Sequence, residues 1–360
     1  MKKIRYLPFG YTIRNGQTVI DQQEAETVRG IFTAYIHGAS LKEIAEDLTA
    51  KNIPYTERTC VWDKARISRI LENAKYTGDE EFEMIIDIHT HTFPYKIAAR
   101  AIEHMEEDIV RGQGFEVKCA RIPTFQGLSD STKSAEIDLS VVCPVATNVT
   151  QPEKINELSV KANEKMDETK VFNFGAIHPD CENYKEIIDD IASMELKAIK
   201  LHPDYQHVFF DDERYIRLID YAANKGLGII VHAGEDVGLP DTIHCTPDMV
   251  LNLWKHIQPE KLILAHMGGW RLWDEVEEKL VGLPFYMDTA VVLNRRFPVR
   301  LGNEQFVRMV RKHGADKILF GTDSPWYDQK QALEDFDNTG LNDDEKKLIL
   351  GENAKRLFGF

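Results

Sequence analysis

Cysteine is scarce in this sequence and is not arranged in any pairing motif. The 360 residues include five cysteines, an odd number at wide spacing, and no C-x-x-C occurs. This usage argues against a disulfide framework and against a cysteine-rich zinc knuckle. A reducing cytoplasm is therefore the expected location.

Long apolar runs are also missing. No stretch approaches the roughly 20 apolar residues that a membrane helix needs, so we expect no membrane partner. The first residues, MKKIRYLPFGY, are basic but are not followed by an apolar segment, so we do not expect a signal peptide.

Basic residues are fewer than acidic ones, and the excess of acidic residues is distributed unevenly along the chain. The net charge is −15, with 44 basic against 59 acidic residues. Residues 1–83 hold 12 basic and 13 acidic residues, which leaves 32 against 46, a net of −14, for residues 84–360. An acidic surface repels phosphate backbones, so the larger part should bind nucleic acid poorly.

Residues 1–83 are predicted to form a small, mostly helical domain. Apolar residues at helical spacing follow Asp21, a candidate N-cap, and Ser40 with Glu43 forms a capping box for a second helix. A third helix is predicted over residues 64–72, so a helix-turn-helix is compatible with the pattern. The acidic run at residues 79–83 reads as a linker.

From Met84 onward the pattern changes to alternating strands and helices. Eight apolar, strand-like segments in about 275 residues predict an α/β fold, a closed (β/α)8 TIM barrel over residues 84–360. The alternative, an open doubly wound sheet, would want a glycine-rich turn after the first strand, where this chain has histidines. The segments are Ile85–His89, Leu139–Pro144, Phe172–Ile177, Ala198–Leu201, Gly228–His232, Leu262–His266, Phe285–Asp288 and Ile318–Gly321.

Metal-ligand side chains mark the ends of several of these segments. His89 and His91 are two residues apart, so they can point to the same face of a strand. His232 and His266 end the fifth and sixth segments, Asp323 follows the eighth, and barrel closure brings such ends to one mouth. Imidazole and carboxylate groups together suit Zn²⁺ and similar ions. Asp323 or His266 is then the candidate general base.

The same region resembles the amidohydrolase superfamily, and within it the amidohydrolase-2 group. The matching motifs are Met84-Ile-Ile-Asp-Ile-His-Thr-His, Ile199-Lys-Leu-His-Pro, Val231-His-Ala-Gly, Leu264-Ala-His-Met-Gly-Gly and Phe320-Gly-Thr-Asp-Ser-Pro. The resemblance implies one divalent metal, usually zinc, held by His89, His91, His232 and Asp323. It also implies that His266 orients or deprotonates the water.

The number of ions stays open, with one favoured over two. In two-metal members of the superfamily, a carbamylated lysine at the end of the fourth strand bridges the ions. Lys200 lies on that strand, and His202 shares its face, so both are less certain metal ligands.

Substrate-binding candidates follow the strand ends. Arg271 suits bidentate binding of a carboxylate, although a surface ion pair explains an arginine equally well. Trp270, Trp326 and Gln206 complete the candidate set, and the polar, irregular residues 101–134 are a candidate lid.

Residues 1–83 resemble the recombinase domain of large serine recombinases, which contacts DNA. The motifs include Leu7-Pro-Phe-Gly-Tyr, Gly38-Ala-Ser-Leu, Ile70-Leu-Glu-Asn and Tyr76-Thr-Gly. The catalytic serine domain is absent from the chain, so a fusion remnant ahead of a complete enzyme is the favoured interpretation. Residues 1–78 carry a net charge of +3, which suggests DNA binding only weakly.

Three functions follow from these patterns. The first is a cytoplasmic hydrolase that uses a metal-activated water on a small carboxylate, amide or lactone-type substrate. The second keeps the metal site but makes the enzyme a non-oxidative decarboxylase. The third is a DNA-binding protein acting through residues 1–83. A homodimer is compatible with the sequence.

Overall fold

The chain divides into two compact units, Met1–Glu83 and Met84–Phe360. The computed structural model describes residues 9–14, 17–55, 59–71, 76 and 84–360. The predicted acidic linker at residues 79–83 lies outside these ranges. Among the described residues, no helix combines the length and apolar character that crossing a membrane requires.

The first unit pairs a short hairpin with three helices. Asp21 caps the first helix, and Ser40 and Glu43 form the predicted capping box of the second. Apolar side chains of the three helices, including Ile31, Ile44 and Ile67, pack in one core. The antiparallel hairpin was not predicted, because its strands are only four residues long. The elements are β1 (Tyr11–Arg14), β2 (Gln17–Ile20), α1 (Gln22–Ile36), α2 (Leu41–Ala50) and α3 (Lys64–Leu71).

Nine parallel strands build the second unit. They fall at the eight positions that the apolar pattern predicts, because β5 and β6 are two parts of one position, interrupted at Phe174. The strands are β3 (Ile86–Thr90), β4 (Leu139–Val142), β5 (Val171–Asn173), β6 (Gly175–Ala176), β7 (Ala198–Leu201), β8 (Gly228–Val231), β9 (Leu262–Leu264), β10 (Tyr286–Asp288) and β11 (Ile318–Leu319).

These strands close on themselves. One sheet has the order β3-β4-β5 and the other has the order β11-β10-β9-β8-β7-β6. The Ile88 N–H donates to the Phe320 carbonyl over 2.9 Å, and Thr90 forms a parallel bridge with Ser324, so the first and last positions are joined. This closure and the parallel order are those of the predicted TIM barrel.

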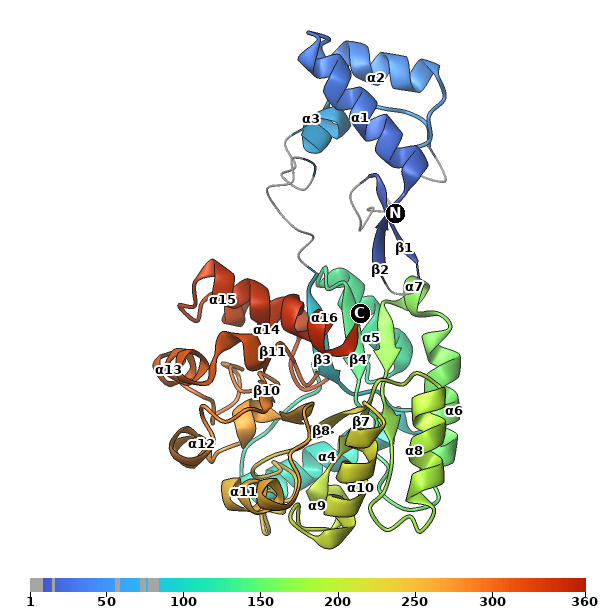
Figure 1. Ribbon diagram of the computed structural model, residues 1–360. Coiled ribbons are helices and arrows are strands. Elements are labelled where there is room, and N and C mark those ends of the chain that lie inside the picture. The colour runs from blue at the N-terminus through green and yellow to red at the C-terminus, as the bar shows by residue number, and fades with distance from the viewer. Residues whose placement is uncertain (1–8, 15–16, 56–58, 72–75, 77–83) are drawn as a thin grey trace. The chain divides into compact units, whose positions relative to one another are not determined.

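Helices surround the strands (Figure 1). Most of them connect successive strands, and they cover the outward strand faces, as a parallel sheet requires. The helices of at least eight residues are α4 (Tyr95–Gln113), α5 (Phe125–Ser134), α6 (Pro152–Asn163), α8 (Tyr184–Ser193), α10 (Glu213–Asn224), α11 (Pro247–His256), α13 (Asn303–His313) and α14 (Gln329–Asp337). The shorter ones are α7 (Met166–Thr169), α9 (Pro203–Gln206), α12 (Trp273–Lys279), α15 (Asp343–Lys347) and α16 (Asn353–Phe358).

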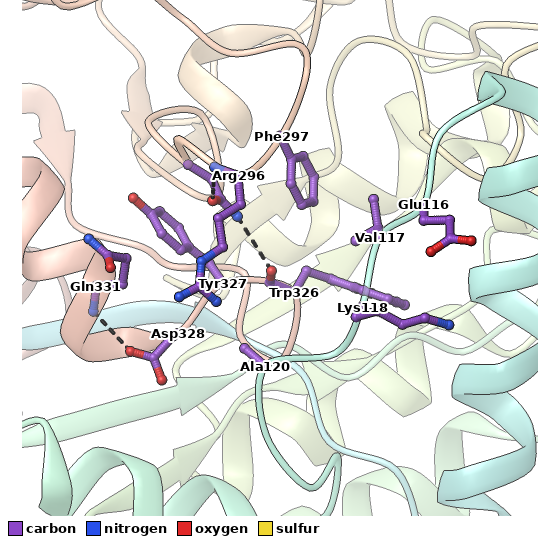
Figure 2. A pocket seen from close by; sticks show the side chains of 11 residues that line it. Glu116, Val117, Lys118, Ala120, Arg296, Phe297, Trp326, Tyr327, Asp328 and Gln331 are labelled. Carbon is purple, nitrogen blue, oxygen red and sulfur yellow. Dashed lines mark hydrogen bonds between the residues drawn. The ribbon is translucent and has the colours of Figure 1, made fainter.

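The predicted irregular lid at residues 101–134 is wrong in its local structure. Most of this segment lies in helices α4 and α5, whose buried faces include Ile102, Ile109 and Leu128. Only residues 114–124 connect the two helices without regular structure. Several residues of this connection line a cavity of about 250 Å³ (Figure 2).

Alternation along the strands separates the barrel interior from the helix layer. Ala198, Ile230 and Ile263 share one apolar cluster, whereas their neighbours Ile199 and Ile229 pack in the cluster that includes the helices. Side chains two residues apart share a face, so the interior row continues from apolar residues to polar ones at the strand ends. The site is built on those polar ends.

Candidate metal centre

The carboxyl ends of the strands bring the predicted histidines and Asp323 to one mouth of the barrel. His89 and His91 come from the end of β3, His202 follows β7, His232 follows β8, His266 follows β9 and Asp323 follows β11. Close packing at this mouth needs small residues, because a Cβ on Gly321 would lie 2.9 Å from the Cβ of His89.

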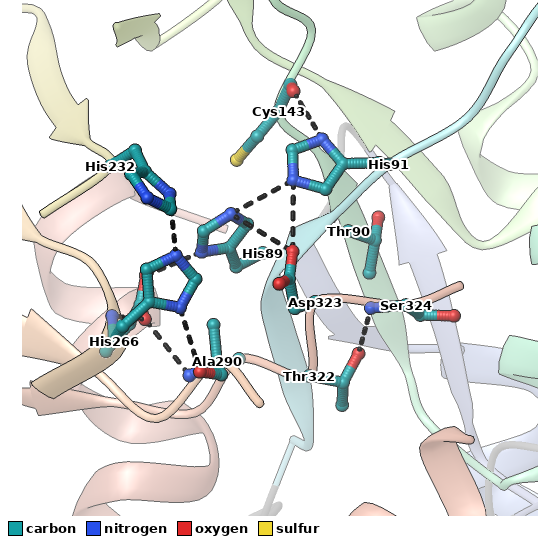
Figure 3. A network of polar contacts seen from close by, with 12 residues as sticks. His89, Thr90, His91, Cys143, His232, His266, Ala290, Thr322, Asp323 and Ser324 are labelled. Atoms are coloured by element: carbon teal, nitrogen blue, oxygen red, sulfur yellow. Dashed lines mark hydrogen bonds and ion pairs between the residues drawn. The ribbon is translucent and has the colours of Figure 1, made fainter. Parts of the chain in front are cut away.

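Three of the predicted ligands converge on one point (Figure 3). The Nε2 atoms of His89 and His91 are 3.2 Å apart, and Oδ1 of Asp323 lies 3.1 Å from His91 Nε2 and 3.7 Å from His89 Nε2. Ligand atoms bound tetrahedrally at about 2.1 Å lie roughly 3.4 Å from one another. The spacing therefore suits a single divalent ion, and these residues form one of two groups that could hold one.

Hydrogen bonds fix which ring nitrogens carry protons. His91 Nδ1 lies 3.0 Å from the Cys143 carbonyl oxygen, and His89 Nδ1 lies 2.8 Å from Oδ2 of Asp288. Both oxygens accept, so both Nδ1 atoms donate, and in a neutral ring Nε2 then keeps its lone pair. Burial, with the charge of Lys200, lowers the pKa of His89 to about 4, so this ring is neutral near pH 7.

The donor set therefore fits a metal ion. Two imidazole nitrogens and a carboxylate oxygen face one another here, with the Lys200 amine 2.9 Å from the His89 nitrogen, and a divalent cation would stabilise this arrangement. A proton would join only two of the three atoms, whereas a metal ion binds all three. Oδ2 of Asp288 accepts a hydrogen bond from Nδ1 of His89, and a hydrogen bond of this kind orients a histidine ligand.

Lys200 and His202, the less certain ligands, lie beside different groups of potential ligands. The Nζ atom of Lys200 is 2.9 Å from Nε2 of His89, within the first group, and its side chain is fully buried. Burial lowers the pKa of this amine. His202 instead lies in the second group, with His232 and Asp236.

His232 is not part of the group formed by His89, His91 and Asp323. Its Nδ1 lies 3.0 Å from Nε2 of His266, and its Nε2 faces Asp204 and Asp236 at 4.0 and 3.9 Å. Burial first, and then the neighbouring histidines, hold the pKa of His232 well below its usual range. The structure thus places His232 between the predicted general base and the second group.

His266 is held by both its ring and its backbone. Its Nδ1 donates to the Ala290 carbonyl over 3.0 Å, and its backbone N–H donates to Oδ1 of Asp288 over 2.9 Å. In Figure 3, His89 lies between His266 on one side and His91 and Asp323 on the other. Both ring nitrogens of His266 are therefore engaged, because its Nε2 lies 3.0 Å from Nδ1 of His232.

Two predicted substrate-binding residues are engaged elsewhere. Arg271 pairs with Glu235 over 2.7 Å, so the surface ion pair, the equally weighted alternative, is what the structure shows. The Gln206 amide donates to the Ala146 and Ile177 carbonyls and accepts from Tyr215 and the His202 N–H. All of its hydrogen-bonding capacity is used, so it positions the turn after β7.

The two predicted tryptophans lie near the cavity. Trp326 lines it together with Arg296 and Phe297, and Figure 2 shows these side chains around the same hollow. Trp270 is buried, with its ring centroid 6.0 Å from that of Phe297 and 6.4 Å from that of His266. Trp270 therefore packs between the predicted base and a wall of the cavity.

Sequence reasoning missed several residues of the site. Asp288 ends the predicted seventh strand, so the rule that singled out the other strand ends could have found it. Arg121 lies in an irregular connection and gives no signal, yet it donates to the His91 carbonyl and to Ser324. Asp204 lies in the short helix α9 after β7, where an acid has many other roles.

Comparisons with known proteins agree with this architecture. A family model described as Amidohydrolase matches residues 86–360, and one described as Recombinase matches residues 22–86. A gamma-resorcylate decarboxylase from Polaromonas sp. is 28% identical over 134 residues, which cover 34% of this chain and 41% of the relative. The match thus spans less than half of the relative's length.

Solved structures share the fold at low identity. The 5-carboxyvanillate decarboxylase of Sphingomonas paucimobilis has a TM-score of 0.56 at 15% identity, over 77% of this chain and 99% of its own. A dihydroxybenzoic acid decarboxylase from Polaromonas, solved with manganese and 2-nitroresorcinol, has a TM-score of 0.56 at 16% identity, over 77% and 97%. Because the Amidohydrolase model covers well over half of the 360 residues, the chain belongs to the amidohydrolase family.

Proposed function

We propose that the protein is a metal-dependent decarboxylase that removes CO₂ from a hydroxylated aromatic acid. The sequence favoured hydrolysis and kept decarboxylation as the alternative. The comparisons support that alternative better, because the curated relative is named a gamma-resorcylate decarboxylase and both fold neighbours are named decarboxylases of phenolic acids.

The cavity lined by Trp326, three residues after Asp323 in the chain, is the structural observation that supports the proposal, although none of the proposed metal ligands lines it. The backbone N–H of Trp326 donates to the Asp323 carbonyl over 3.0 Å, so this wall of the cavity is tied to the proposed ligand. Phe297 and Trp326 offer aromatic faces, and Arg296 offers a guanidinium. Aromatic faces and a guanidinium are the groups that recognise a flat ring bearing a carboxylate.

Decarboxylation needs one proton and the return of one electron pair. The proton joins the ring carbon that bears the carboxylate, the bond to the carboxyl carbon breaks, its electrons return to the ring, and CO₂ leaves. We take Asp323, with 14% of its side chain exposed, or His266 as the group that would carry that proton. A bound divalent ion would polarise a substrate oxygen.

His89, His91 and Asp323 would hold this ion. Histidine and carboxylate ligands bind either zinc, which the sequence favoured, or manganese, which a fold neighbour contains. The amine of Lys200, whose pKa burial lowers, lies 2.9 Å from His89 Nε2 and would supply a positive charge in the same buried space when protonated. Such a charge would favour binding of an anionic substrate.

Product analysis on the purified full-length protein tests this proposal. With 2,6-dihydroxybenzoate or 5-carboxyvanillate, we expect CO₂ and the decarboxylated phenol in equal amounts. The Asp323→Asn and His266→Asn variants should lose activity, and the matched surface variant His256→Asn should keep it. Hydrolysis of amides or lactones without any CO₂ release from aromatic acids would instead support the hydrolase.

DNA binding by residues 1–83 is a second candidate function. The Recombinase model matches residues 22–86, and α3 carries Lys64, Arg66 and Arg69 without an acidic residue. In a mobility-shift assay with the full-length protein, Lys64→Gln and Arg69→Gln should each reduce the salt slope by about 1. A wild-type protein that gives no salt-sensitive shift would exclude this function. A homodimer and a cytoplasmic location remain predictions.

A further inference from the structure

We propose that Asp87 is a positioning residue, whose buried carboxylate holds the turn after β11 in the conformation that directs Asp323 at His91. Asp87 lies on β3, two residues before His89, but it does not belong to the group of potential ligands. The inference rests on the metal centre of the proposed function, and it does not depend on which reaction that centre performs.

The carboxylate of Asp87 is fully buried and accepts hydrogen bonds from four uncharged donors. Its Oδ1 accepts the backbone N–H groups of Thr322 and His89, over 2.9 and 3.3 Å. Its Oδ2 accepts the Thr322 hydroxyl over 2.6 Å and the side-chain amide of Gln329 over 2.8 Å. Burying a carboxylate among uncharged groups costs free energy that an apolar side chain would not cost. The carboxylate therefore has a role other than packing.

The hydroxyl of Thr322 transmits the effect of Asp87 along the turn. A carboxylate oxygen only accepts, so Oγ1 of Thr322 donates its proton to Asp87. Its lone pairs are then free to accept the backbone N–H of Ser324, 3.1 Å away (Figure 3). Asp87 is thus connected, through one side chain, to both of the residues that flank Asp323.

The backbone of Asp323 needs such support. Its φ is 61°, in the left-handed region that residues other than glycine adopt uncommonly. A conformation of this kind persists only where the surrounding structure enforces it. The Asp323 N–H donates to the His89 carbonyl over 2.8 Å, and the bonds of Thr322 to Asp87 fix the preceding residue. In this conformation Oδ1 of Asp323 lies 3.1 Å from Nε2 of His91.

Hydrogen bonds to other elements of the barrel hold Asp87 itself in place. Gln329, at the start of α14, donates from Nε2 to Oδ2 of Asp87 and to Oγ of Ser140, each over 2.8 Å. Ser140 lies on β4, and its hydroxyl is 2.7 Å from the hydroxyl of Thr132 on α5. Because two helices and a second strand fix the carboxylate, it is a rigid support for the turn.

The zinc affinity of the full-length protein tests this role. The protein is stripped with a chelator, and its affinity for Zn²⁺ is measured by competition with a chelating dye. Thr322→Val keeps the shape of the side chain and removes the hydroxyl, so we expect the affinity to fall by about 10-fold or more. Asp87→Asn replaces an accepting oxygen with an N–H donor, so it should cause a similar fall. Thr322→Ser keeps the hydroxyl and should keep most of the affinity.

A variant that lacks the positioned carboxylate distinguishes positioning from a general loss of stability. If Asp87 acts on the ion through Asp323, the two changes are coupled, and Asp87→Asn should lower the affinity of Asp323→Asn by less than about 2-fold. A fall in that background as large as in the wild type would show that Asp87 does not act through Asp323, and it would overturn the inference.

Thr339→Val is the matched control, because Thr339 is also buried and its hydroxyl donates to the Phe336 carbonyl instead of to a residue of the mouth. It should bind Zn²⁺ as the wild type does. Circular dichroism and thermal unfolding of the stripped proteins establish that each variant folds. Wild-type affinity in both Thr322→Val and Asp87→Asn would overturn the inference. Because CO₂ release is measured separately, that result would leave the proposed function standing.

Discussion

Oδ2 of Asp288 lies 2.8 Å from Nδ1 of His89, and the other oxygen of the same carboxylate accepts the backbone N–H groups of His266 and Ala290. One buried carboxylate thus fixes the ring of a proposed metal ligand and the backbone of the proposed proton carrier. Groups that orient a ligand in this way contribute to metal affinity without touching the ion.

Replacing Asp288 with asparagine should weaken metal binding at His89. The amide can donate to Nδ1 and thereby favour the tautomer that protonates Nε2, so we expect an affinity loss of about 10- to 100-fold. Competition with a chelating dye measures the loss. The exposed Asp316→Asn serves as the control, and equal affinities in wild type and Asp288→Asn would contradict this role.

Arg121 should be required to hold the two loops that carry His91 and Asp323. It donates to the His91 carbonyl over 2.6 Å and to the Ser324 hydroxyl over 2.7 Å, so it joins the loops after β3 and β11. Lysine cannot reproduce this fork of donors. We expect Arg121→Lys to destabilise the protein by about 1–3 kcal/mol, measured by urea unfolding.

The exposed Arg111→Lys provides the comparison for that experiment. Burial lowers the pKa of the Arg121 guanidinium to about 10, which still leaves it charged near pH 7. The effect should therefore persist across neutral pH. If Arg121→Lys unfolds at the same urea concentration as the wild type, the hydrogen bonds of Arg121 to the two loops do not contribute to the free energy of unfolding.

Changes in the cavity should alter substrate binding more than folding. If the cavity receives the aromatic acid, Trp326→Ala removes a ring face and Arg296→Gln removes a positive charge. Each change should lower kcat/KM by roughly 10-fold or more, through a higher KM. Steady-state kinetics measure this, with the exposed Arg300→Gln as a control. Unchanged kinetics in both variants would place the substrate elsewhere.

Asp212 supplies a prediction on pH that is independent of the metal centre. It caps α10, and its hydrogen bond with Arg214 lowers its pKa to about 2 from 3.8. A depressed pKa contributes stability above about 3.8 that is lost as the pH falls through about 2. Because the pair is partly exposed, the contribution should be below about 1 kcal/mol.

The Asp212→Asn variant keeps the cap and removes the charge, so it isolates that contribution. Wild type should exceed it slightly in stability near pH 7, and the difference should shrink below about pH 4. Asp212→Ala, which also loses the cap, should cost about 1 kcal/mol more. A difference that stays constant down to pH 3 would show that the ion pair is not its source.

The barrel and half of its site were accessible from sequence because they follow from a periodic pattern. Apolar runs ending in His89, His232 and Asp323 predict both strands and a shared mouth. The rest of the site depends on contacts between residues that are far apart in the sequence. Whether the Nε2 of His232 faces His91 or Asp204 depends on a hydrogen bond from a ring 34 residues away, and no local pattern encodes it.

Hydrogen bonds between buried side chains are the other feature that the sequence did not predict. Gln206 resembles a substrate-binding residue in the sequence, but its amide is fully used within the turn after β7. Arg121 resembles a surface arginine, yet it joins two loops of the mouth. Both roles depend on side chains that meet only after the barrel closes.

CO₂ release from 2,6-dihydroxybenzoate by the metal-stripped protein, before and after Mn²⁺ is added, tests whether the chain is a metal-dependent decarboxylase. We expect no release from the stripped protein, recovery with Mn²⁺, and no recovery in His89→Ala/His91→Ala at any Mn²⁺ concentration. Release by the stripped protein, or by the double variant at the wild-type rate, would contradict this expectation.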